Sequence, residues 1–408
     1  MRLKCGLLGE KLGHSYSPQI HAMLADYEYK LYERSREELD SFLRSGDWDG
    51  LNVTIPYKKA VVSYCAELSD MARRLGSVNT IVRRPDGSLY GDNTDAYGFE
   101  KLVRRSGIQV AGKKALVLGS GGASVTVCAV LEKLGAREVI VISRSGENNY
   151  DNISIHADAE IIANTTPVGM YPKNGGSPVD LSLFPKCKGV LDVVYNPART
   201  ALILQAESLE LPCASGLYML VAQAKRSSEQ FAGTEIADSE IERIERRLRL
   251  DMQNIVLVGM PGSGKSTVAA MLSKALNRPV YESDKYIEER EGRSIPDIFA
   301  ADGEEYFREK ETAALAELGK LSGAVLSTGG GCVTREENFP LLHQNGVIVW
   351  IKRDTGVLDK SGRPLSLSGS LEEMYRRRKP MYARFADLEV DNNNTPEETV
   401  DQIMEALK

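Results

Sequence analysis

The stretch Gly259-Met260-Pro261-Gly262-Ser263-Gly264-Lys265-Ser266 follows the apolar run 255–258 and precedes a helical pattern that begins at Thr267. Glycines in such a loop let backbone N–H groups converge on phosphate oxygens at the N-terminus of the next helix. The Lys265 ammonium adds a positive charge, and the Ser266 hydroxyl can bind Mg²⁺. The stretch therefore predicts a site for a nucleoside triphosphate such as ATP, with Mg²⁺, built from Gly262, Ser263, Gly264, Lys265, Ser266 and Thr267.

Length and composition bound the class of protein. A chain of 408 residues suggests two or three domains. The net charge of −6, without a long basic run, argues against a nucleic-acid partner. Six cysteines without a paired spacing indicate free thiols in a reducing compartment. With no apolar run long enough for a signal peptide or a membrane span, we expect a soluble, cytoplasmic protein without a membrane partner. Its oligomeric state stays open.

Short apolar runs alternate with helical patterns along the whole chain, which predicts an α/β fold with parallel sheets. Residues 1–100 form the first α/β unit, and helical segments at about 217–250 complete it. Residues 101–216 form a Rossmann-like unit, and residues 253–408 form the phosphate-loop domain. Three residues, 251–253, separate the last helix of the first half from the strand that leads into the phosphate loop.

A second glycine loop lies in the Rossmann-like unit. It follows the apolar run 114–118, opens a helical segment, and consists of Gly119, Ser120, Gly121, Gly122 and Ala123. This arrangement is typical of pyrophosphate binding at a helix N-terminus. The next predicted strand ends at Ser143-Arg144-Ser145, with no carboxylate until Glu147. Because a basic residue there accommodates a ribose 2′-phosphate, these three residues favour NADP over NAD.

Polar residues are unusually dense in the predicted loops of the first hundred positions. Hydroxyls, amides and a Lys/Asp pair, Lys58 and Asp95, could together bind a small polyhydroxylated acid. A lysine held by a carboxylate can donate a proton to the alkoxide that forms when hydride reaches a ketone. Next to a dinucleotide loop, the pair indicates a ketone reductase.

Six motifs in residues 1–250 occur in the order seen in shikimate dehydrogenases, which this part of the chain resembles. They are Gly13-His14-Ser15-x-Ser17-Pro18, Asn52-Val53-Thr54-x-Pro56-x-Lys58, Gly76-x-Val78-Asn79-Thr80, Gly91-Asp92-Asn93-Thr94-Asp95, Asn164-x-Thr166-Pro167-x-Gly169-Met170 and Gly216-x-x-Met219-Leu220-x-x-Gln223-Ala224. The resemblance implies that Lys58 and Asp95 are catalytic. It also implies a shikimate site formed by Ser15, Ser17, Thr54, Lys58, Asn79, Asp95, Tyr195 and Gln223.

The chain departs from that family after the basic motif at 143–145. The family usually has a helix there, whereas only residues 146–151 precede a possible strand at 153–155. A parallel crossover normally needs a dozen or more residues, so we expect a bare loop. The missing helix would lie beside the adenosine half of the cofactor, and this leaves open how strictly NADP is preferred to NAD.

Residues 253–408 resemble shikimate kinase. The resemblance rests on Glu282-Ser283-Asp284, the segment from Gly292 to Arg308, Gly329-Gly330-Gly331, Arg363-Pro364-Leu365 and Arg378-x-Pro380-x-Tyr382. It implies a substrate site formed by Asp284, Arg308, Gly329, Gly330, Gly331 and Arg378. Asp284 would position or deprotonate the substrate alcohol, and Lys265 and Arg363 would stabilise the transferring phosphoryl group. Ser266 and Glu282 would hold the Mg²⁺ ion.

This half also departs from its family. Glu282 replaces the first aspartate of D-x-D, and the segment 352–362 is short. We find no counterpart of the arginine that stacks on adenine in many members of the family, so the adenine contacts stay open.

The leading hypothesis is therefore a bifunctional enzyme of the shikimate pathway. One half would reduce 3-dehydroshikimate with NADPH, and the other would phosphorylate the shikimate 3-hydroxyl with ATP and Mg²⁺. A non-catalytic sensor of pathway intermediates is the alternative from another class, but it predicts eroded catalytic positions, and these are intact. A quinate-using dehydrogenase fused to a small-molecule kinase is a third possibility. Channelling between the sites has no support in the sequence.

Overall fold

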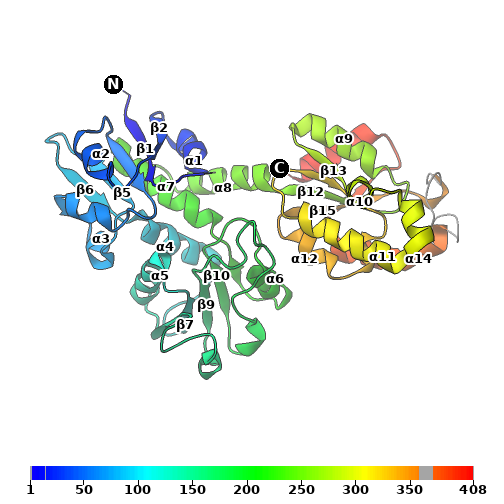
Figure 1. Cartoon of the computed structure of the whole chain (residues 1–408), viewed down its shortest axis with the longest axis horizontal. Coiled ribbons are helices and arrows are strands. Elements are labelled where there is room, and N and C mark those ends of the chain that lie inside the picture. The colour runs from blue at the N-terminus through cyan, green and yellow to red at the C-terminus, as the bar shows by residue number, and fades with distance from the viewer. Residues whose placement is uncertain (1, 14, 358–370, 408) are drawn as a thin grey trace. The chain divides into compact units, whose positions relative to one another are not determined.

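The computed structural model describes residues 2–13, 15–357 and 371–407. Contacts divide the chain into two compact units. The first comprises residues 1–168, 177–195 and 205–247, and the second comprises residues 169–176, 196–204 and 248–408. The α/β fold class is confirmed in both, because helices flank the two sheets of the first unit and the single sheet of the second (Figure 1).

The first sheet has six strands in the order β2-β1-β3-β5-β6-β4. Its strands are β1 (Lys4–Gly9), β2 (Glu28–Glu33), β3 (Gly50–Val53), β4 (Glu67–Leu68), β5 (Thr80–Arg83) and β6 (Leu89–Asp92). The connections contain α1 (Ser17–Leu24), α2 (Leu39–Ser45), the 3-10 helix η1 (Ala60–Tyr64) and α3 (Asp70–Leu75). The strands β1, β2 and β3 run parallel, with Leu7 paired to Leu31 on one side and to Asn52 on the other.

This sheet is mixed, which departs in part from the expected parallel sheets. The strand β5 runs antiparallel to both β3 and β6. A tight hairpin reverses the chain between β5 and β6, where Gly87 has φ +84° and the Arg84 N–H donates to the Ser88 carbonyl at 2.8 Å. An Asp-Gly pair such as Asp86-Gly87 is a strong hairpin signal, because the turn needs a residue with positive φ.

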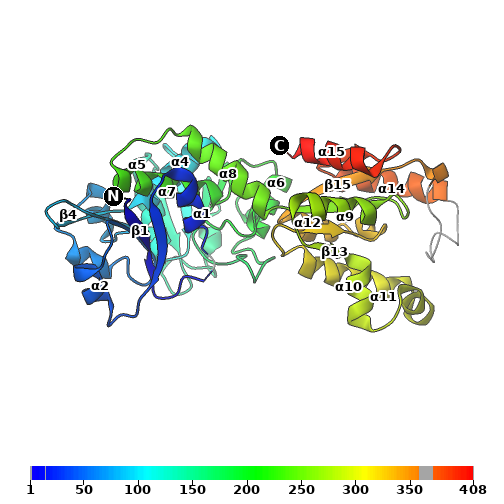
Figure 2. The same cartoon turned by 90° about the horizontal axis from the view of Figure 1, so that it is seen from above.

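The second sheet of this unit is entirely parallel, in the order β11-β10-β9-β7-β8. Its elements are β7 (Lys114–Leu118), α5 (Gly122–Lys133), β8 (Glu138–Ile142), β9 (Ile161–Asn164), η3 (Leu181–Leu183), β10 (Gly189–Asp192), α6 (Ala201–Ser208) and β11 (Cys213–Ala214). The unit also contains α4 (Thr94–Ser106), α7 (Leu217–Ala232) and most of α8 (Ser239–Met252), which Figures 1 and 2 show as long helices.

The crossover from β8 to β9 lacks an α-helix, as expected. The strand predicted at 153–155 is wrong, however, because these residues belong to the 3-10 helix η2 (Ile153–His156). Asparagine side chains tie this crossover together: Asn149 accepts from the backbone of Asp151 at 2.9 Å, and Asn152 donates to the Glu147 carbonyl at 2.8 Å. Such side-chain bonds to the backbone favour turns over strands.

The second unit contains a five-stranded parallel sheet in the order β13-β14-β12-β15-β16. Its strands are β12 (Asn254–Val258), β13 (Val280–Glu282), β14 (Val325–Ser327), β15 (Gly346–Lys352) and β16 (Leu388–Asp391). Its helices are α9 (Lys265–Leu276), α10 (Ser283–Glu291), α11 (Ile295–Leu318), η4 (Cys332–Thr334), α12 (Asn338–His343), η5 (Thr355–Val357), α14 (Leu371–Phe385) and α15 (Pro396–Ala406). Since α8 extends to Met252, only Gln253 separates it from β12, fewer than the three residues expected.

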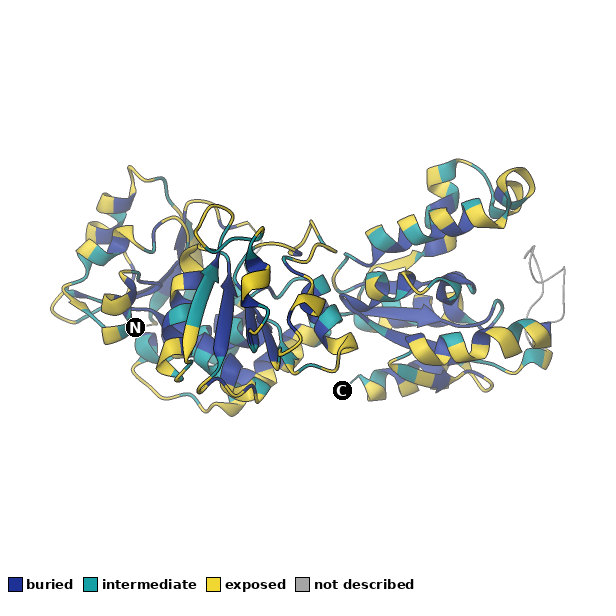
Figure 3. Cartoon of the chain, turned by 90° about the horizontal axis from the view of Figure 1, so that it is seen from below, coloured by how far each residue is buried: buried dark blue, intermediate teal, exposed yellow. Residues whose placement is uncertain are grey.

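The buried residues gather on the sheets of each unit, and the exposed residues lie on the outer helix faces (Figure 3). Strands β7 and β12 are buried along their whole length, because helices cover both faces of their sheets. Within the described part of the chain, no helix is both long and apolar enough to cross a membrane.

Candidate active sites

Two elements bring the predicted catalytic pair of the first unit together. Lys58 lies in the turn after β3, and Asp95 lies in the first turn of α4. The Lys58 Nζ atom is 2.6 Å from the Asp95 Oδ2 atom. Their side chains are 29% and 21% exposed, so the pair is held by the fold yet remains reachable by a small molecule. The arrangement can deliver a proton and keep its donor in place.

Two further predicted residues lie beside this pair. The Asn79 Oδ1 atom accepts the backbone N–H of Thr94 at 2.7 Å, which fixes the start of α4. The Thr94 hydroxyl lies 3.5 Å from the Oε1 atom of Gln223 on α7. The helices α4 and α7 approach closely at Gly98, where an added Cβ would lie 2.6 Å from the Met219 carbonyl oxygen. Thr94 was quoted in a motif but not assigned to the site, and the structure shows that it connects Asn79 with Gln223.

The remaining predicted residues come from loops around these elements. The Ser17 backbone N–H donates to the Ser15 hydroxyl at 3.2 Å where α1 begins. The Thr54 N–H donates to the Leu8 carbonyl at 2.9 Å, which places Thr54 just past the end of β3. The Tyr195 ring packs edge-on against Tyr16, with 6.1 Å between the ring centres. Their binding roles stay predictions.

The dinucleotide loop connects β7 to α5. Gly119 has φ +102°, and an added Cβ there would lie 2.9 Å from the Thr166 Cγ2 atom. Gly121 precedes the first residue of α5, and a Cβ on it or on Gly122 would meet no neighbouring atom within 4 Å. The helix N-terminus is therefore open to an approaching ligand. Free backbone N–H groups at such a terminus suit a pyrophosphate, so these residues fit a dinucleotide.

The predicted 2′-phosphate residues, Ser143, Arg144 and Ser145, lie at the end of β8. Arg144 and Ser145 are exposed, and the Ser143 N–H donates to the Asn148 carbonyl at 3.1 Å. The asparagine-tied crossover therefore positions the basic segment without the missing helix. An exposed guanidinium at this edge fits a phosphate ligand.

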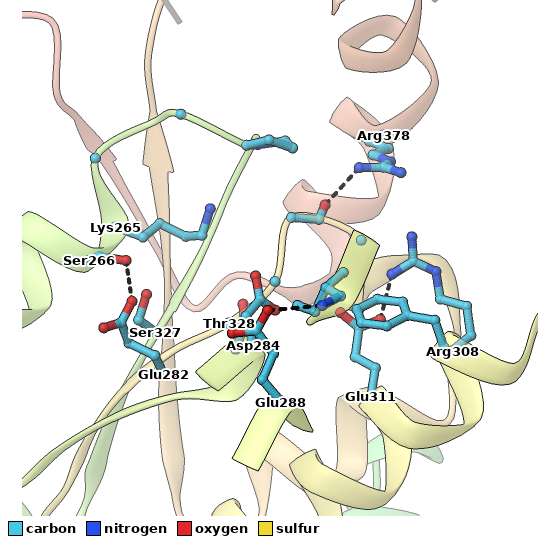
Figure 4. Close-up of a pocket in the computed structure, with 18 of the residues that line it drawn as sticks. Lys265, Ser266, Glu282, Asp284, Glu288, Arg308, Glu311, Ser327, Thr328 and Arg378 are labelled. Atoms are coloured by element: carbon cyan, nitrogen blue, oxygen red, sulfur yellow. Dashed lines mark hydrogen bonds and ion pairs between the residues drawn. The ribbon is translucent and has the colours of Figure 1, made fainter. Parts of the chain in front are cut away.

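A cavity of about 490 Å³ opens at the carboxyl end of the parallel sheet in the second unit. Figure 4 shows Lys265, Ser266 and Glu282 at one end, Arg308 and Arg378 at the other, and Asp284 between them. It is also lined by Gly262, Gly264, Thr267, Gly329, Gly330 and Gly331, so most predicted kinase residues meet in one place. Ser263, a residue of the phosphate loop itself, is fully buried and does not line the cavity. Arg363 lies outside the described residues.

The phosphate end of the cavity combines a cation with a pair of oxygen ligands. The Lys265 Nζ atom donates to the carbonyls of Gly259 and Met260, at 2.9 Å each, which holds it over the loop. The Ser266 hydroxyl donates to the Glu282 Oε2 atom at 2.7 Å. Burial opposes the ionised form of Glu282, but hydrogen bonds from Lys285 and Ser266 lower its pKa. Two oxygens beside bound phosphates fit Mg²⁺, which takes only one or two protein ligands at such sites.

The opposite end presents two guanidinium groups. Arg308 on α11 donates to the Glu311 Oε2 atom at 2.6 Å, and Arg378 on α14 donates to the Gly330 carbonyl at 3.0 Å. A Cβ added to Gly331 would collide with the Arg308 guanidinium, so a larger residue there would displace Arg308. Two forked, permanently charged donors suit a carboxylate.

Asp284 lies between the two ends. Burial raises the pKa of its carboxyl, and the nearby Glu288 raises it further, whereas Lys265, Ser283 and Arg308 act in the opposite direction. A carboxylate whose proton affinity is increased in this way is a better proton acceptor at neutral pH than an exposed aspartate.

Three charged residues that line the cavity were not predicted: Glu288, Glu311 and Arg353. Glu311 is fully buried, and its Oε1 atom has no hydrogen-bond partner within the described ranges. Its position three residues after Arg308 on a helix was the available signal, since such residues are neighbours on one helix face. Nothing in the sequence marked Arg353, which follows β15.

The fold and the two sites define the class: the chain is a nucleotide-dependent enzyme with two α/β parts. Two family models match, the shikimate dehydrogenase substrate-binding domain over residues 7–81 and shikimate kinase over residues 261–408. The shikimate dehydrogenase (NADP(+)) of Clostridium perfringens is 35% identical over 265 residues, which cover 60% of this chain and 97% of that protein.

Solved structures resemble the same part of the chain. The chorismate mutase/shikimate 5-dehydrogenase fusion protein of Clostridium acetobutylicum aligns with a TM-score of 0.58 and 35% identity over 61% of this chain and 97% of its own. The quinate dehydrogenase of Corynebacterium glutamicum, in complex with NAD, aligns with a TM-score of 0.55 and 28% identity over 60% and 98%.

The chain belongs to the shikimate dehydrogenase family, and its C-terminal part is a shikimate kinase domain. It is therefore a bifunctional enzyme of the shikimate pathway with dehydrogenase and kinase activities. The name of the Clostridium perfringens relative agrees with the prediction of NADP(H), and the match to shikimate kinase agrees with the prediction of ATP.

Proposed function

We propose that the first unit reduces 3-dehydroshikimate to shikimate with NADPH, and that the second transfers the γ-phosphoryl group of ATP to the shikimate 3-hydroxyl. The observation that carries the first half is the 2.6 Å contact between Lys58 and Asp95 beside Asn79 and Gln223. The observation that carries the second is the placing of Asp284 between the phosphate loop and two arginines.

In the reduction, bound NADPH supplies the hydride that reaches the keto carbon. Lys58 donates the proton that the keto oxygen takes up, and Asp95 keeps Lys58 aimed at that oxygen. Ser15, Ser17, Thr54, Asn79, Tyr195 and Gln223 would orient the substrate. Gly119 to Ala123 and Ser143 to Ser145 would hold the dinucleotide, with Arg144 at the 2′-phosphate.

In the phosphorylation, Asp284 accepts the proton of the 3-hydroxyl as that oxygen bonds to the γ-phosphorus and the bond to ADP breaks. Lys265 stabilises the charge on the transferring group, and Ser266 and Glu282 would hold Mg²⁺ through its water shell. Arg308 and Arg378 would bind the shikimate carboxylate. The backbone of Gly329, Gly330 and Gly331 would close the acceptor end, and Arg363 would act from outside the described residues.

The proposed reactions share one atom. The keto oxygen that becomes a hydroxyl in the first step is the oxygen that is phosphorylated in the second. The proposed domains follow this division: residues 1–100 with 217–250 for the dehydrogenase substrate, 101–216 for NADP, and 253–408 for the kinase.

Steady-state assays of the full chain test both halves separately. We expect NADPH oxidation that depends on 3-dehydroshikimate, and ADP release that depends on shikimate and Mg²⁺. If only one of these two activities is detected, only that half of the proposal stands, and the other half is wrong.

A second candidate substrate is quinate with NAD, and the likeness to quinate dehydrogenase supports testing it. Arg144 at the end of β8 favours the phosphorylated cofactor. Comparing kcat/KM for shikimate with NADP⁺ and for quinate with NAD⁺ decides between them. A larger value for quinate with NAD⁺ would replace the first proposal.

A further inference from the structure

Four cations line the kinase cavity, and three of them have protein partners. Lys265 donates to two backbone carbonyls, Arg308 pairs with Glu311 and Glu304, and Arg378 donates to the Gly330 carbonyl. The fourth is Arg353. Across residues 2–13, 15–357 and 371–407, the Arg353 side chain has no hydrogen-bond or ion-pair partner, and its Nε atom is buried. A buried polar atom without a partner is costly, so the buried part of this guanidinium favours a site where a ligand binds the group.

The position of Arg353 identifies the end of the cavity that it serves. It directly follows β15, which pairs in parallel with β12, the strand before the phosphate loop. Both strands therefore end at the same edge of the sheet. A Cβ added to Gly264 would lie 3.6 Å from the Arg353 Nη1 atom, so the guanidinium lies against the phosphate loop.

The side chains next to this guanidinium bond to other groups. Asn392 fills the other side of Gly264 and donates to the Ser263 carbonyl at 2.7 Å, which fixes the loop. The preceding cation, Lys352, points elsewhere and pairs with Glu389 at 3.1 Å on the surface. The carboxylate-binding pair Arg308 and Arg378 lies at the far end of the cavity (Figure 4).

We propose that Arg353 is a nucleotide-binding residue that donates to the phosphate oxygens of bound ATP and ADP. This inference rests on the proposed kinase function and adds a second positive charge, besides Lys265, at the phosphate end. A forked guanidinium binds phosphate oxygens in pairs and cannot lose its charge. Here Arg353 is the first residue after β15, so the end of this strand places it directly at the phosphate loop.

The test compares Arg353→Ala and Arg353→Lys with Lys352→Ala as the matched control. Arg353→Ala should weaken ADP binding, measured calorimetrically on the full chain, by roughly 10- to 100-fold, the range of a charge-assisted hydrogen bond. Arg353→Lys should lose less, because it keeps the charge but not the fork. KM for ATP should rise accordingly, while KM for shikimate and the dehydrogenase activity should change less than about twofold, as should every parameter of Lys352→Ala.

Inorganic tripolyphosphate, as a competitor of ATP, distinguishes a phosphate contact from a base contact. If Arg353 contacts phosphates, Arg353→Ala weakens the inhibition by tripolyphosphate as much as it weakens ADP binding. Weaker ADP binding with unchanged tripolyphosphate inhibition would overturn the proposal and assign Arg353 to the adenine. Unchanged ADP binding would overturn it outright. A wild-type chain that binds ADP but does not phosphorylate shikimate would contradict the proposed function and leave this inference standing.

Discussion

The Lys58 Nζ atom lies 2.6 Å from the Asp95 Oδ2 atom, although 37 positions separate the two residues in the chain. The backbone creates this contact: β3 ends just before Lys58, and β6 ends just before α4 and Asp95. Since β5 runs antiparallel to both β3 and β6, these two strands run in the same direction. Their C-terminal ends, which lead to Lys58 and Asp95, therefore lie at the same edge of the sheet.

Replacing Lys58 by alanine should lower kcat for NADPH-dependent reduction by about 10²- to 10⁴-fold, the usual contribution of a positioned proton donor. KM for shikimate in the kinase assay should stay the same, because Lys58 is not among the residues that line the kinase cavity. Lys59→Ala is the control, since Lys59 is exposed and adjacent. Loss of both activities in a folded Lys58→Ala variant would contradict the independence of the sites.

The pH dependence of the kinase should follow Asp284. The ionised carboxylate is the active form, so kcat/KM for shikimate falls as the pH drops through the pKa of Asp284. Burial raises this pKa and Glu288 raises it further, while Lys265, Ser283 and Arg308 lower it. Glu288→Gln removes one negative charge but keeps the oxygen that accepts the Ile295 N–H at 2.9 Å. The acid limb should therefore move to lower pH.

The pH profile of the dehydrogenase in the same Glu288→Gln protein is the internal control and should not move. An acid limb of the kinase that stays in place, or moves to higher pH, would show that another group controls it.

Glu311→Gln should destabilise the kinase part and weaken shikimate binding together. Glu311 is fully buried and pairs with Arg308 at 2.6 Å, so the substitution removes the buried one of the guanidinium's two carboxylate partners and leaves the exposed Glu304. Removing one partner of a buried pair costs about 3–5 kcal/mol. The readouts are the temperature at which half of the kinase activity is lost and KM for shikimate.

The matched control is Glu304→Gln, because Glu304 also pairs with Arg308, at 3.1 Å, but its side chain is 52% exposed. An exposed pair contributes about 0–1 kcal/mol. Equal effects of the two substitutions would rule out a special role for the buried partner.

Gly331→Ala should raise KM for shikimate at least about tenfold, because the added methyl group occupies the place of the Arg308 guanidinium and displaces a charge-assisted contact. Gly356→Ala is the control, since a Cβ there meets nothing within 4 Å. A crystal structure or binding curve in which Gly331→Ala holds shikimate normally would contradict the assignment of this end of the cavity.

The sequence predicted the parts of the molecule that depend on local pattern. The phosphate loop, the glycine loop before α5 and the long helices α7 and α8 follow from residue spacing alone. Strand direction in the first sheet did not, because it depends on the Gly87 turn, whose signal is two residues long. The expected strand at 153–155 failed because asparagine side chains compete for the backbone.

The same distinction holds for the sites. Asp284 and Arg308 lie in recognisable motifs, whereas Arg353 reaches the cavity only through the parallel pairing of β15 with β12. Thr94 connects Asn79 with Gln223 only because α4 packs on α7, and no local sequence pattern predicts this packing. Residues whose function depends on a distant neighbour need the fold before they can be assigned.

The acceptor end of the kinase cavity is walled by main chain at Gly329, Gly330 and Gly331, where added side chains would strike Glu311, Pro261 and Arg308. Drug resistance usually arises when a side chain in contact with the inhibitor is exchanged. An inhibitor that rests on this backbone wall and hydrogen-bonds to its peptide groups would offer no such exchange. A substitution at one of these glycines that excluded the inhibitor would also displace a residue of the cavity. It would therefore lower the kinase activity at the same time as it conferred resistance.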